Sequence, residues 1–120
     1  LPRKQIKDLV YINHRTDVAL VATIPEAHGD EIVGVGRYYL DERSNLAEVA
    51  FIVRDKWQNR GIGTLLLRRL NTIARRNGIG GFTAEVLREN RAMQSVLNKS
   101  NARVQCTPDD NTLSYRLEFK

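Results

Sequence analysis

The segment from Trp57 to Leu70, WQNRGIGTLLLRRL, constrains this chain most, because it places two helix-weakening glycines where an amphipathic helix begins. A run of apolar β-formers, residues 46–55, precedes it, so the local order is strand, turn, helix. The first N–H groups of a helix lack partners within the helix, and the helix dipole adds positive charge there. Because glycine has no Cβ, an anion can sit directly on these donors. The segment therefore predicts an anion site.

The predicted anion is a phosphate, the usual ligand of such a turn. The donors that we expect to face it are the backbone amides of Asn59, Gly61, Gly63 and Thr64. The guanidinium groups that would add charge nearby belong to Arg54, Arg60 and Arg68. The P-loop pattern is absent, and Leu66 stands where a dinucleotide fingerprint needs its third glycine. From local geometry alone, a tight turn without a ligand remains an equal alternative.

The rest of the chain predicts one mixed α/β domain, residues 1–120, since no repeat, low-complexity run or linker divides it. The first residue is not methionine, so we expect a piece of a longer protein. The continuous apolar middle of 46–55 predicts a strand buried on both faces, and Gly34 and Gly36 predict a bend or a close backbone approach. The periodicities predict a short amphipathic helix at 1–13, strands at 17–25, 31–40 and 46–55, a helix at 61–77, a strand at 81–87, a helix at 90–100, and strands at 102–107 and 113–119.

The composition limits the classes of partner. The net charge of +5 suits an anionic ligand, but it is equally typical of an ordinary basic surface. We expect no nucleic-acid partner, because aromatic residues that would stack bases are not interleaved with the charges. The longest apolar run, Val49 to Val53, is too short to span a membrane. A lone cysteine, Cys106, excludes an internal disulfide and favours a cytoplasmic setting, and with His14 and His28 it shows no metal-ligand spacing, so we expect no metal.

A family resemblance extends this interpretation. QNRGIG, residues 58–63, matches the [Q/R]-x-x-G-x-[G/A] pyrophosphate-binding motif of the GNAT superfamily of N-acetyltransferases, and EVLRENRAMQSVLNKSNA, residues 85–102, is similar to its strand-then-helix segment. The resemblance runs from Val18 to the C-terminus and looks most like the acetyltransferase domain of Pat-type protein lysine acetyltransferases. It implies an α/β (α+β) fold with a mixed, mostly antiparallel sheet flanked by helices. The family's usual first strand and helix are not recognisable here.

The resemblance implies acetyl-CoA as the acyl-donor substrate. The residues that would wrap its pyrophosphate are Gln58, Asn59, Arg60, Gly61, Ile62, Gly63 and Thr64. The backbone that would pair with the pantetheine arm belongs to Ile52, Val53 and Arg54. This pairing requires the strand at 46–55 to splay from the strand that begins at Gly81. Asn90 would contact the cofactor near its thioester or pantetheine end.

Acyl transfer to an amine requires a base and an oxyanion donor. An ammonium group, with a pKa of about 10.4 in water, must lose a proton, and the tetrahedral oxyanion must be stabilised. The resemblance implies Glu48, in AEVAF, as the base, and partial burial would improve it. Strand alternation alone does not separate this role from that of an ordinary outward-facing residue, and without the resemblance the ordinary residue is favoured. We expect the backbone N–H of Ile52 to stabilise the oxyanion, and Glu85 to be structural or peripheral.

The general acid is not assigned by the sequence. Leu97 stands where many family members place the tyrosine that protonates the departing thiolate. Three other tyrosines, Tyr38, Tyr39 and Tyr115, are the available substitutes.

The expected function is therefore acetyl-CoA-dependent N-acetylation of a protein lysine, such as that of an acyl-CoA synthetase. Two alternatives stay open: a small-amine N-acetyltransferase, and a non-catalytic acyl-CoA-sensing regulatory domain. An open sheet edge would favour a homodimer, and the resemblance also implies a fused partner domain.

Overall fold

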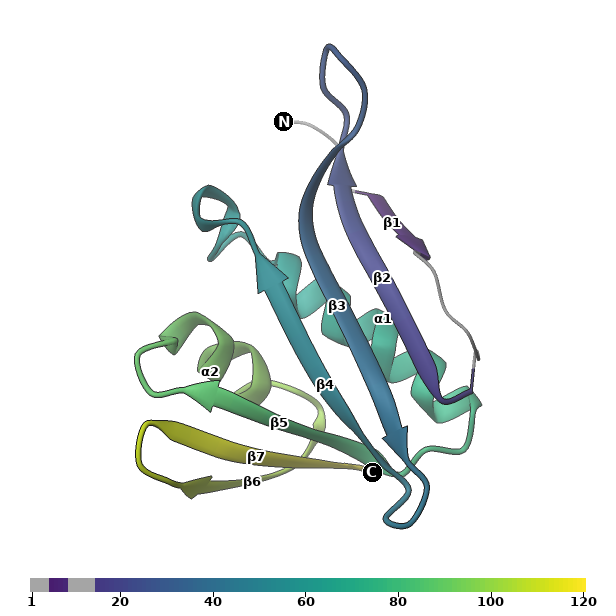
Figure 1. Ribbon diagram of the computed structural model, residues 1–120, viewed down its shortest axis with the longest axis vertical. Helices are drawn as coiled ribbons and strands as arrows, with labels where there is room; N and C mark the ends of the chain where they lie inside the picture. Colours follow the sequence, from purple (N-terminus) through teal and green to yellow (C-terminus); the bar gives the residue numbers. More distant parts are fainter. Residues whose placement is uncertain (1–4, 9–14) are drawn as a thin grey trace.

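The computed structural model describes residues 5–8 and 15–120, which form a seven-stranded sheet of order β1-β2-β3-β4-β5-β7-β6 with two α-helices (Figure 1). Only β4 and β5 pair in parallel, so the expected mixed, mostly antiparallel sheet is confirmed. No helix in the described ranges is both long and apolar enough to cross a membrane. The elements are β1 (Gln5–Asp8), β2 (Asp17–Ile24), β3 (Glu31–Asp41), β4 (Leu46–Val53), the 3₁₀ turn η1 (Asp55–Trp57), α1 (Ile62–Arg76), β5 (Gly81–Leu87), α2 (Arg91–Asn98), β6 (Ala102–Pro108) and β7 (Thr112–Phe119).

The N-terminal segment differs from the prediction. A helix was expected over residues 1–13, but Gln5–Asp8 form β1, which pairs antiparallel with residues 20–23 of β2. The remainder of that predicted helix, at 1–4 and 9–13, lies outside the described residues. Pairing along the edge of β2 satisfies backbone groups of both segments, whereas one helical turn is costly to nucleate. A strand therefore precedes the one at 17–24, where only a helix was expected.

Two glycines in β3 allow α1 to lie close to the sheet. A Cβ on Gly34 would stand 2.9 Å from Cγ2 of Ile62, and one on Gly36 would stand 3.3 Å from Cδ1 of Leu70. Their predicted close backbone approach is therefore confirmed, with α1 as the neighbouring element. In Figure 1, α1 crosses behind β2, β3 and β4.

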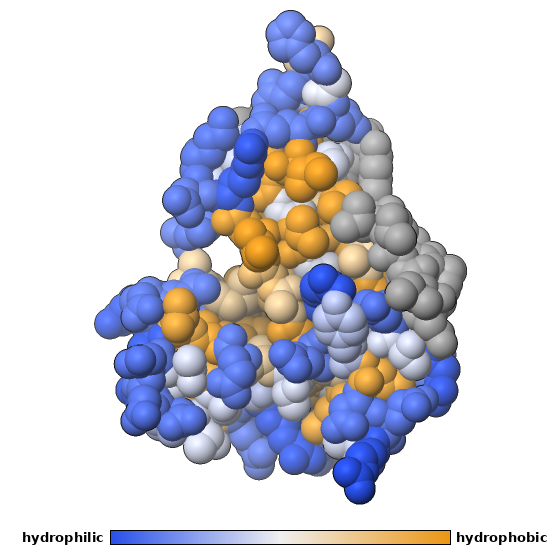
Figure 2. Space-filling view, in the orientation of Figure 1, coloured by the Kyte–Doolittle hydropathy of each residue, from blue (hydrophilic) through white to orange (hydrophobic). Residues whose placement is uncertain are grey.

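The opposite face of β4 is exposed, so the predicted burial of this strand on both faces is wrong. Buried and exposed residues alternate along this strand. Ala47 and Val49 are buried, whereas Glu48 and Ala50 are exposed, and Ile52 is 75% exposed. Alternation of this kind is typical of an antiparallel strand covered on one side only. Figure 2 shows apolar surface on the uncovered face over the upper part of the sheet.

β4 and β5 diverge from a common vertex (Figure 1). They pair only at Leu46–Gly81, Ala47–Phe82 and Glu48–Thr83, so the predicted splay of the two strands is confirmed. At the vertex, a Cβ on Gly81 would come within 2.1 Å of the carbonyl oxygen of Leu117, so no side chain fits there. Among the described residues, no strand pairs with the β5-facing edge of β4 beyond Glu48.

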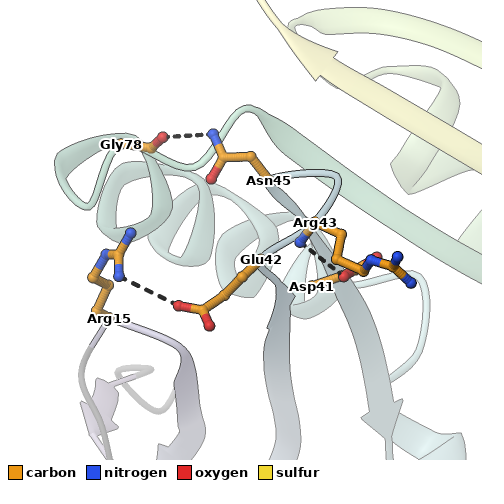
Figure 3. A network of polar contacts seen from close by, with 6 residues as sticks. All are labelled: Arg15, Asp41, Glu42, Arg43, Asn45 and Gly78. Carbon is orange, nitrogen blue, oxygen red and sulfur yellow. Dashed lines mark hydrogen bonds and ion pairs between the residues drawn. The ribbon is translucent and has the colours of Figure 1, made fainter.

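A polar network holds the turn between β3 and β4 (Figure 3). Asn45 has a left-handed backbone, with φ of 58°, and its side-chain amide donates a hydrogen bond to the carbonyl oxygen of Gly78. The Gly80 N–H donates to the carbonyl oxygen of Asn45 at 2.8 Å. Arg15 and Glu42 form an exposed ion pair beside this network, with 3.5 Å between Nη1 and Oε1. The contacts join the β3–β4 turn to the segment that leads from α1 into β5.

Candidate functional site

The turn before α1 presents open backbone donors. Asn59 and Gly61 both have left-handed backbones, with φ of 62° and 83°. Gly61 caps the helix without a side-chain hydrogen bond, and the first turn of α1 carries no acidic residue that would compete for its N–H groups. Alternation of left- and right-handed residues turns successive N–H groups into a concave anion-binding nest. The turn thus has the backbone that the sequence predicted for an anion site.

Glycine is favoured at positions 61 and 63 for different structural reasons. A Cβ on Gly61 would meet nothing within 4 Å, so its positive φ, rather than crowding, favours glycine. Gly63 lies inside α1, where a Cβ would stand 3.4 Å from Cγ2 of Val96 and 3.7 Å from Cε of Met93. Gly63 therefore marks where α2 packs against the start of α1.

A groove of about 500 Å³ connects this turn to β4 and α2. Figure 2 shows the molecular outline hollowed on the left, between the part that holds the end of β4 and the part that holds α2 and β5. The predicted cofactor-binding residues that line the groove are Ile52, Val53, Gln58, Asn59, Gly61, Ile62, Gly63, Thr64 and Asn90. The open end of β4 and the open helix turn thus share one cavity.

All three arginines predicted near the anion site, Arg54, Arg60 and Arg68, lie outside this lining. The guanidinium of Arg54 forms an ion pair with Glu31 at the start of β3. That of Arg60 lies over the ring of Trp57, 5.0 Å from the ring centroid. Trp57 itself lines the groove, so Arg60 contacts a residue of the lining.

The register of β4 decides which backbone groups face the gap. The N–H of Arg54 donates to the carbonyl oxygen of Val33 in β3, at 2.9 Å. Because N–H groups alternate in direction along a strand, the N–H of Ile52 also faces β3, whereas those of Phe51 and Val53 face away from it. In agreement, the carbonyl oxygen of Val53 accepts a hydrogen bond from Nε2 of Gln58 at 3.2 Å. The groups at the open edge belong to Phe51 and Val53.

Asn90 has a local structural role. Its Oδ1 accepts a hydrogen bond from the N–H of Met93 at 3.1 Å and so caps α2. A ligand in the groove can therefore meet Asn90 through its side-chain NH₂ group while the cap remains in place.

Glu48 lies where the two strands part. It stands opposite Thr83 in the last pair between β4 and β5, on the face away from α1, and its side chain is exposed. The partial burial that would improve this carboxylate as a base is therefore not found at Glu48. Glu48 instead lines a second cavity of about 430 Å³, together with Glu85, which sequence analysis treated as peripheral.

The tyrosines considered as acids lie outside the groove. Tyr38 is fully buried, and its hydroxyl accepts a hydrogen bond from Nδ2 of Asn77 at 3.2 Å; burial raises its pKa. Tyr115 is buried opposite Cys106 in β6. Its pKa is raised mainly by burial and, to a smaller extent, by the Cys106 thiol. Tyr39, in contrast, is 45% exposed, and the Arg37 guanidinium lies 4.3 Å from its ring centroid.

Sequence analysis missed two polar residues that line the groove, Ser95 in α2 and Lys99 directly after it. Leu97, at the family's usual tyrosine position, is fully buried instead. The signal was the spacing of Ala92, Ser95 and Lys99, which places them on one helical face. Within residues 5–8 and 15–120, no three His, Cys, Asp or Glu side chains gather into a metal-binding group.

Comparisons with known proteins agree with this geometry. The pattern of the Acetyltransferase (GNAT) family matches residues 3–101. The chain is 30% identical over 107 residues to acetyltransferase PA5475 of Pseudomonas aeruginosa, covering 89% of this chain and 58% of that protein. It is 41% identical over 59 residues to acetyltransferase Pat of Mycolicibacterium smegmatis, covering 49% of this chain and 18% of that protein.

Comparisons with solved structures agree with these sequence comparisons. The GNAT domain of S. lividans PAT superimposes with a TM-score of 0.74 at 27% identity, covering 92% of this chain and 65% of that one. A cAMP-binding acyltransferase from Mycobacterium smegmatis gives 0.75 at 25% identity, covering 91% of this chain and 33% of that one. The chain thus spans less than two thirds of each of these relatives. The match of the family pattern to residues 3–101 establishes that the chain belongs to the GNAT acetyltransferase family.

Proposed function

We propose that this chain is an acetyl-CoA-dependent N-acetyltransferase that uses the groove between β4, α1 and α2 for its acyl donor. The observation that supports this most is the union, in one cavity, of the open edge of β4 with the uncapped first turn of α1. An extended chain of amides can pair with the strand edge while a diphosphate meets the helix turn.

The donor is held by backbone groups in this proposal. The N–H groups from Gly61 to Thr64 bind the diphosphate, with the positive end of the α1 dipole behind them. Val53, whose N–H group faces the gap, pairs with the pantetheine amides, which leaves the N–H of Phe51 for the thioester carbonyl. Lys99 adds a positive charge from the α2 side of the same groove.

The chemistry places the acceptor amine at the vertex. Glu48 takes a proton from the incoming ammonium, and the free amine then attacks the thioester carbonyl carbon. The N–H of Phe51, rather than that of Ile52, stabilises the oxyanion, because the Ile52 N–H faces β3. The carbon–sulfur bond breaks as the amide forms, and the second proton lost by the nitrogen neutralises the thiolate, which leaves toward α2, where Ser95 and Lys99 carry hydrogen-bond donors.

We propose a protein lysine as the acceptor, such as that of an acyl-CoA synthetase. The support is the similarity to acetyltransferase Pat, which is 41% identical over 59 residues. A small amine is the second candidate acceptor. The exposed Glu48 carboxylate at the point where the strands separate favours an enzyme over a regulatory domain that only senses acyl-CoA.

The test combines transfer and binding in one pair of variants. Glu48→Gln should lower acetyl transfer to a lysine peptide by about 100-fold or more, because it removes the base. Calorimetry should show acetyl-CoA still bound, since the groove is unchanged. The matched control is Glu26→Gln, a charge change in the exposed β2–β3 loop, which should leave both measurements unchanged. Wild-type protein that fails to bind acetyl-CoA, or equal transfer by Glu48→Gln, contradicts the proposal.

A further inference from the structure

The second cavity is formed by polar side chains that share one face of the sheet. Glu48 pairs with Thr83, which pairs in turn with Arg116, so all three belong to the face away from α1. Glu85, two residues after Thr83, lies on that same face opposite Ser114. These five residues line the cavity of about 430 Å³. It lies across the sheet from α1, whose first turn borders the donor groove.

The cavity is acidic although the chain as a whole carries a net charge of +5. Its two carboxylates come from Glu48 and Glu85. Its one cation, Arg116, already pairs with Glu118, with 3.0 Å between Nε and Oε2. The Ser114 hydroxyl donates a hydrogen bond to Oε1 of Glu85, which orients that carboxylate without neutralising it. Two negative charges therefore face whatever enters this cavity.

The spacing of the two carboxylates separates their roles. Glu48 stands opposite Thr83, whereas Glu85 lies two residues, or about 6.6 Å, farther along β5. A single ammonium group beside Glu48 therefore leaves Glu85 for another part of the same molecule. An exposed carboxylate in such a position attracts a second positive charge.

We propose that the acceptor is dicationic, with its reacting amine beside Glu48 and a second positively charged group on Glu85. This inference rests on the proposed acetyltransferase function and specifies its acceptor. Glu85 is a specificity-determining residue that binds the acceptor and takes no part in proton transfer. Two kinds of molecule share this chemistry: a small amine with a second cation, and a protein lysine next to an arginine.

The test compares acceptors that differ only in the second charge. Agmatine carries one primary amine and one guanidinium, whereas pentylamine carries the amine alone; the peptides are Lys-Arg and Lys-Gln with both ends blocked. The wild-type kcat/KM should favour the dicationic member of a pair by about fivefold, as expected for one partly exposed charge pair. Preference in the small-amine pair or the peptide pair identifies the source of the acceptor.

Glu85→Gln should reduce this ratio to near one, mainly through a higher KM for the dicationic acceptor. Glutamine keeps an oxygen for the Ser114 hydroxyl, so the sheet contact survives. Glu85→Asp should restore part of the preference, and the control Glu26→Gln should keep all of it. A wild-type ratio near one in both pairs, or a ratio unaffected by Glu85→Gln, overturns the inference while leaving acetyl transfer intact.

A binding measurement covers the case in which no amine is acetylated, which would contradict the proposed function. Agmatine added to ¹⁵N-labelled protein without acetyl-CoA should shift the amide signals of Thr83 and Ser114 more than pentylamine does. Glu85→Gln should remove that difference. Equal shifts from the two amines, or shifts that persist in Glu85→Gln, overturn the dicationic site independently of catalysis.

Discussion

The side-chain amide of Asn45 donates a hydrogen bond to the carbonyl oxygen of Gly78 at 2.9 Å, which ties the turn between β3 and β4 to the end of α1 (Figure 3). The carbonyl oxygen of Asn45 accepts a second hydrogen bond from the N–H of Gly80, just before β5 begins. The strands β4 and β5 therefore start from one fixed point. The angle at which they diverge depends on contacts remote from the groove itself.

Replacing Asn45 should destabilise the vertex. Asn45→Ala removes the bond to Gly78 and places alanine at φ of 58°, so the free energy of unfolding should fall by about 1–2 kcal/mol. Asn45→Gly loses the same bond but tolerates the backbone, so it should lie nearer the wild type. Urea denaturation measures both. Equal loss in the two variants would show that the left-handed backbone contributes nothing.

The two ends of α1 provide a matched pair of glycines. Gly61 and Gly78 both have positive φ, 83° and 75°, and a Cβ on either meets nothing within 4 Å. Alanine at either position should therefore lower the free energy of unfolding by a similar amount, about 1–2 kcal/mol. Only Gly61→Ala should weaken acetyl-CoA binding, by about tenfold, because only Gly61 shapes the diphosphate turn. Calorimetry measures the affinity of each variant for acetyl-CoA. An equal loss of affinity in Gly78→Ala would contradict the assigned site.

Hydrogen exchange tests the direction of the β4 amides. The N–H of Ile52 faces β3 and should be protected in the free protein, whereas those of Phe51 and Val53 should exchange faster. Saturating acetyl-CoA should slow exchange at Phe51 and Val53 by about tenfold or more, because they gain partners. Amide-resolved NMR measures all three. Protection gained chiefly at Ile52 would restore that residue as the donor that contacts the ligand.

The vertex should tolerate substitution at one glycine and not at its neighbour. A Cβ on Gly81 would stand 2.1 Å from a backbone oxygen of β7, whereas one on Gly80 would stand 3.3 Å from the oxygen of Asn45. We expect Gly81→Ala to cost about 3 kcal/mol or more, and Gly80→Ala distinctly less. Thermal unfolding ranks the two. A Gly81→Ala protein as stable as Gly80→Ala would mean that β5 and β7 do not pair as described.

Buried tyrosines should make the fold sensitive to alkali. Burial raises the pKa of Tyr38 above its unfolded value of about 10, so the folded state holds this proton more tightly. The contribution is fully present below about pH 10 and is lost as the pH rises through the folded pKa. Tyr38→Phe should therefore flatten the decline of unfolding free energy above pH 10, as measured by urea denaturation. An unchanged slope would show that Tyr38 ionises as easily in the folded state.

Local patterns predicted most of the fold. The period change between 46–55 and 61–77 identified β4 and α1, and the glycine turn between them has the left-handed backbone that an anion site needs. The segment at 5–8 was misread, because four residues carry little periodicity and their state depends on a distant partner, β2. Long-range pairing is not visible in such a short pattern.

The details of the site depended on register. Whether Ile52 or its neighbours face the gap follows from one hydrogen bond between Arg54 and Val33, which sequence does not reveal. Glu85 looked peripheral because only the pairing of β4 with β5 places it on the same face as Glu48. A residue type and its strand are predictable, but its direction requires the neighbouring strand.

The close contact between Gly34 and Ile62 has a consequence for how such a site can be adjusted. Ile62 is the first residue of α1, and a methyl group at Gly34 would press on it from beneath, at 2.9 Å from Cγ2. Relief of that overlap would lift the helix start away from the strands and enlarge the space between them. The affinity of the groove for the proposed acyl donor can therefore be altered by a substitution at Gly34 in β3, a residue that does not line the groove.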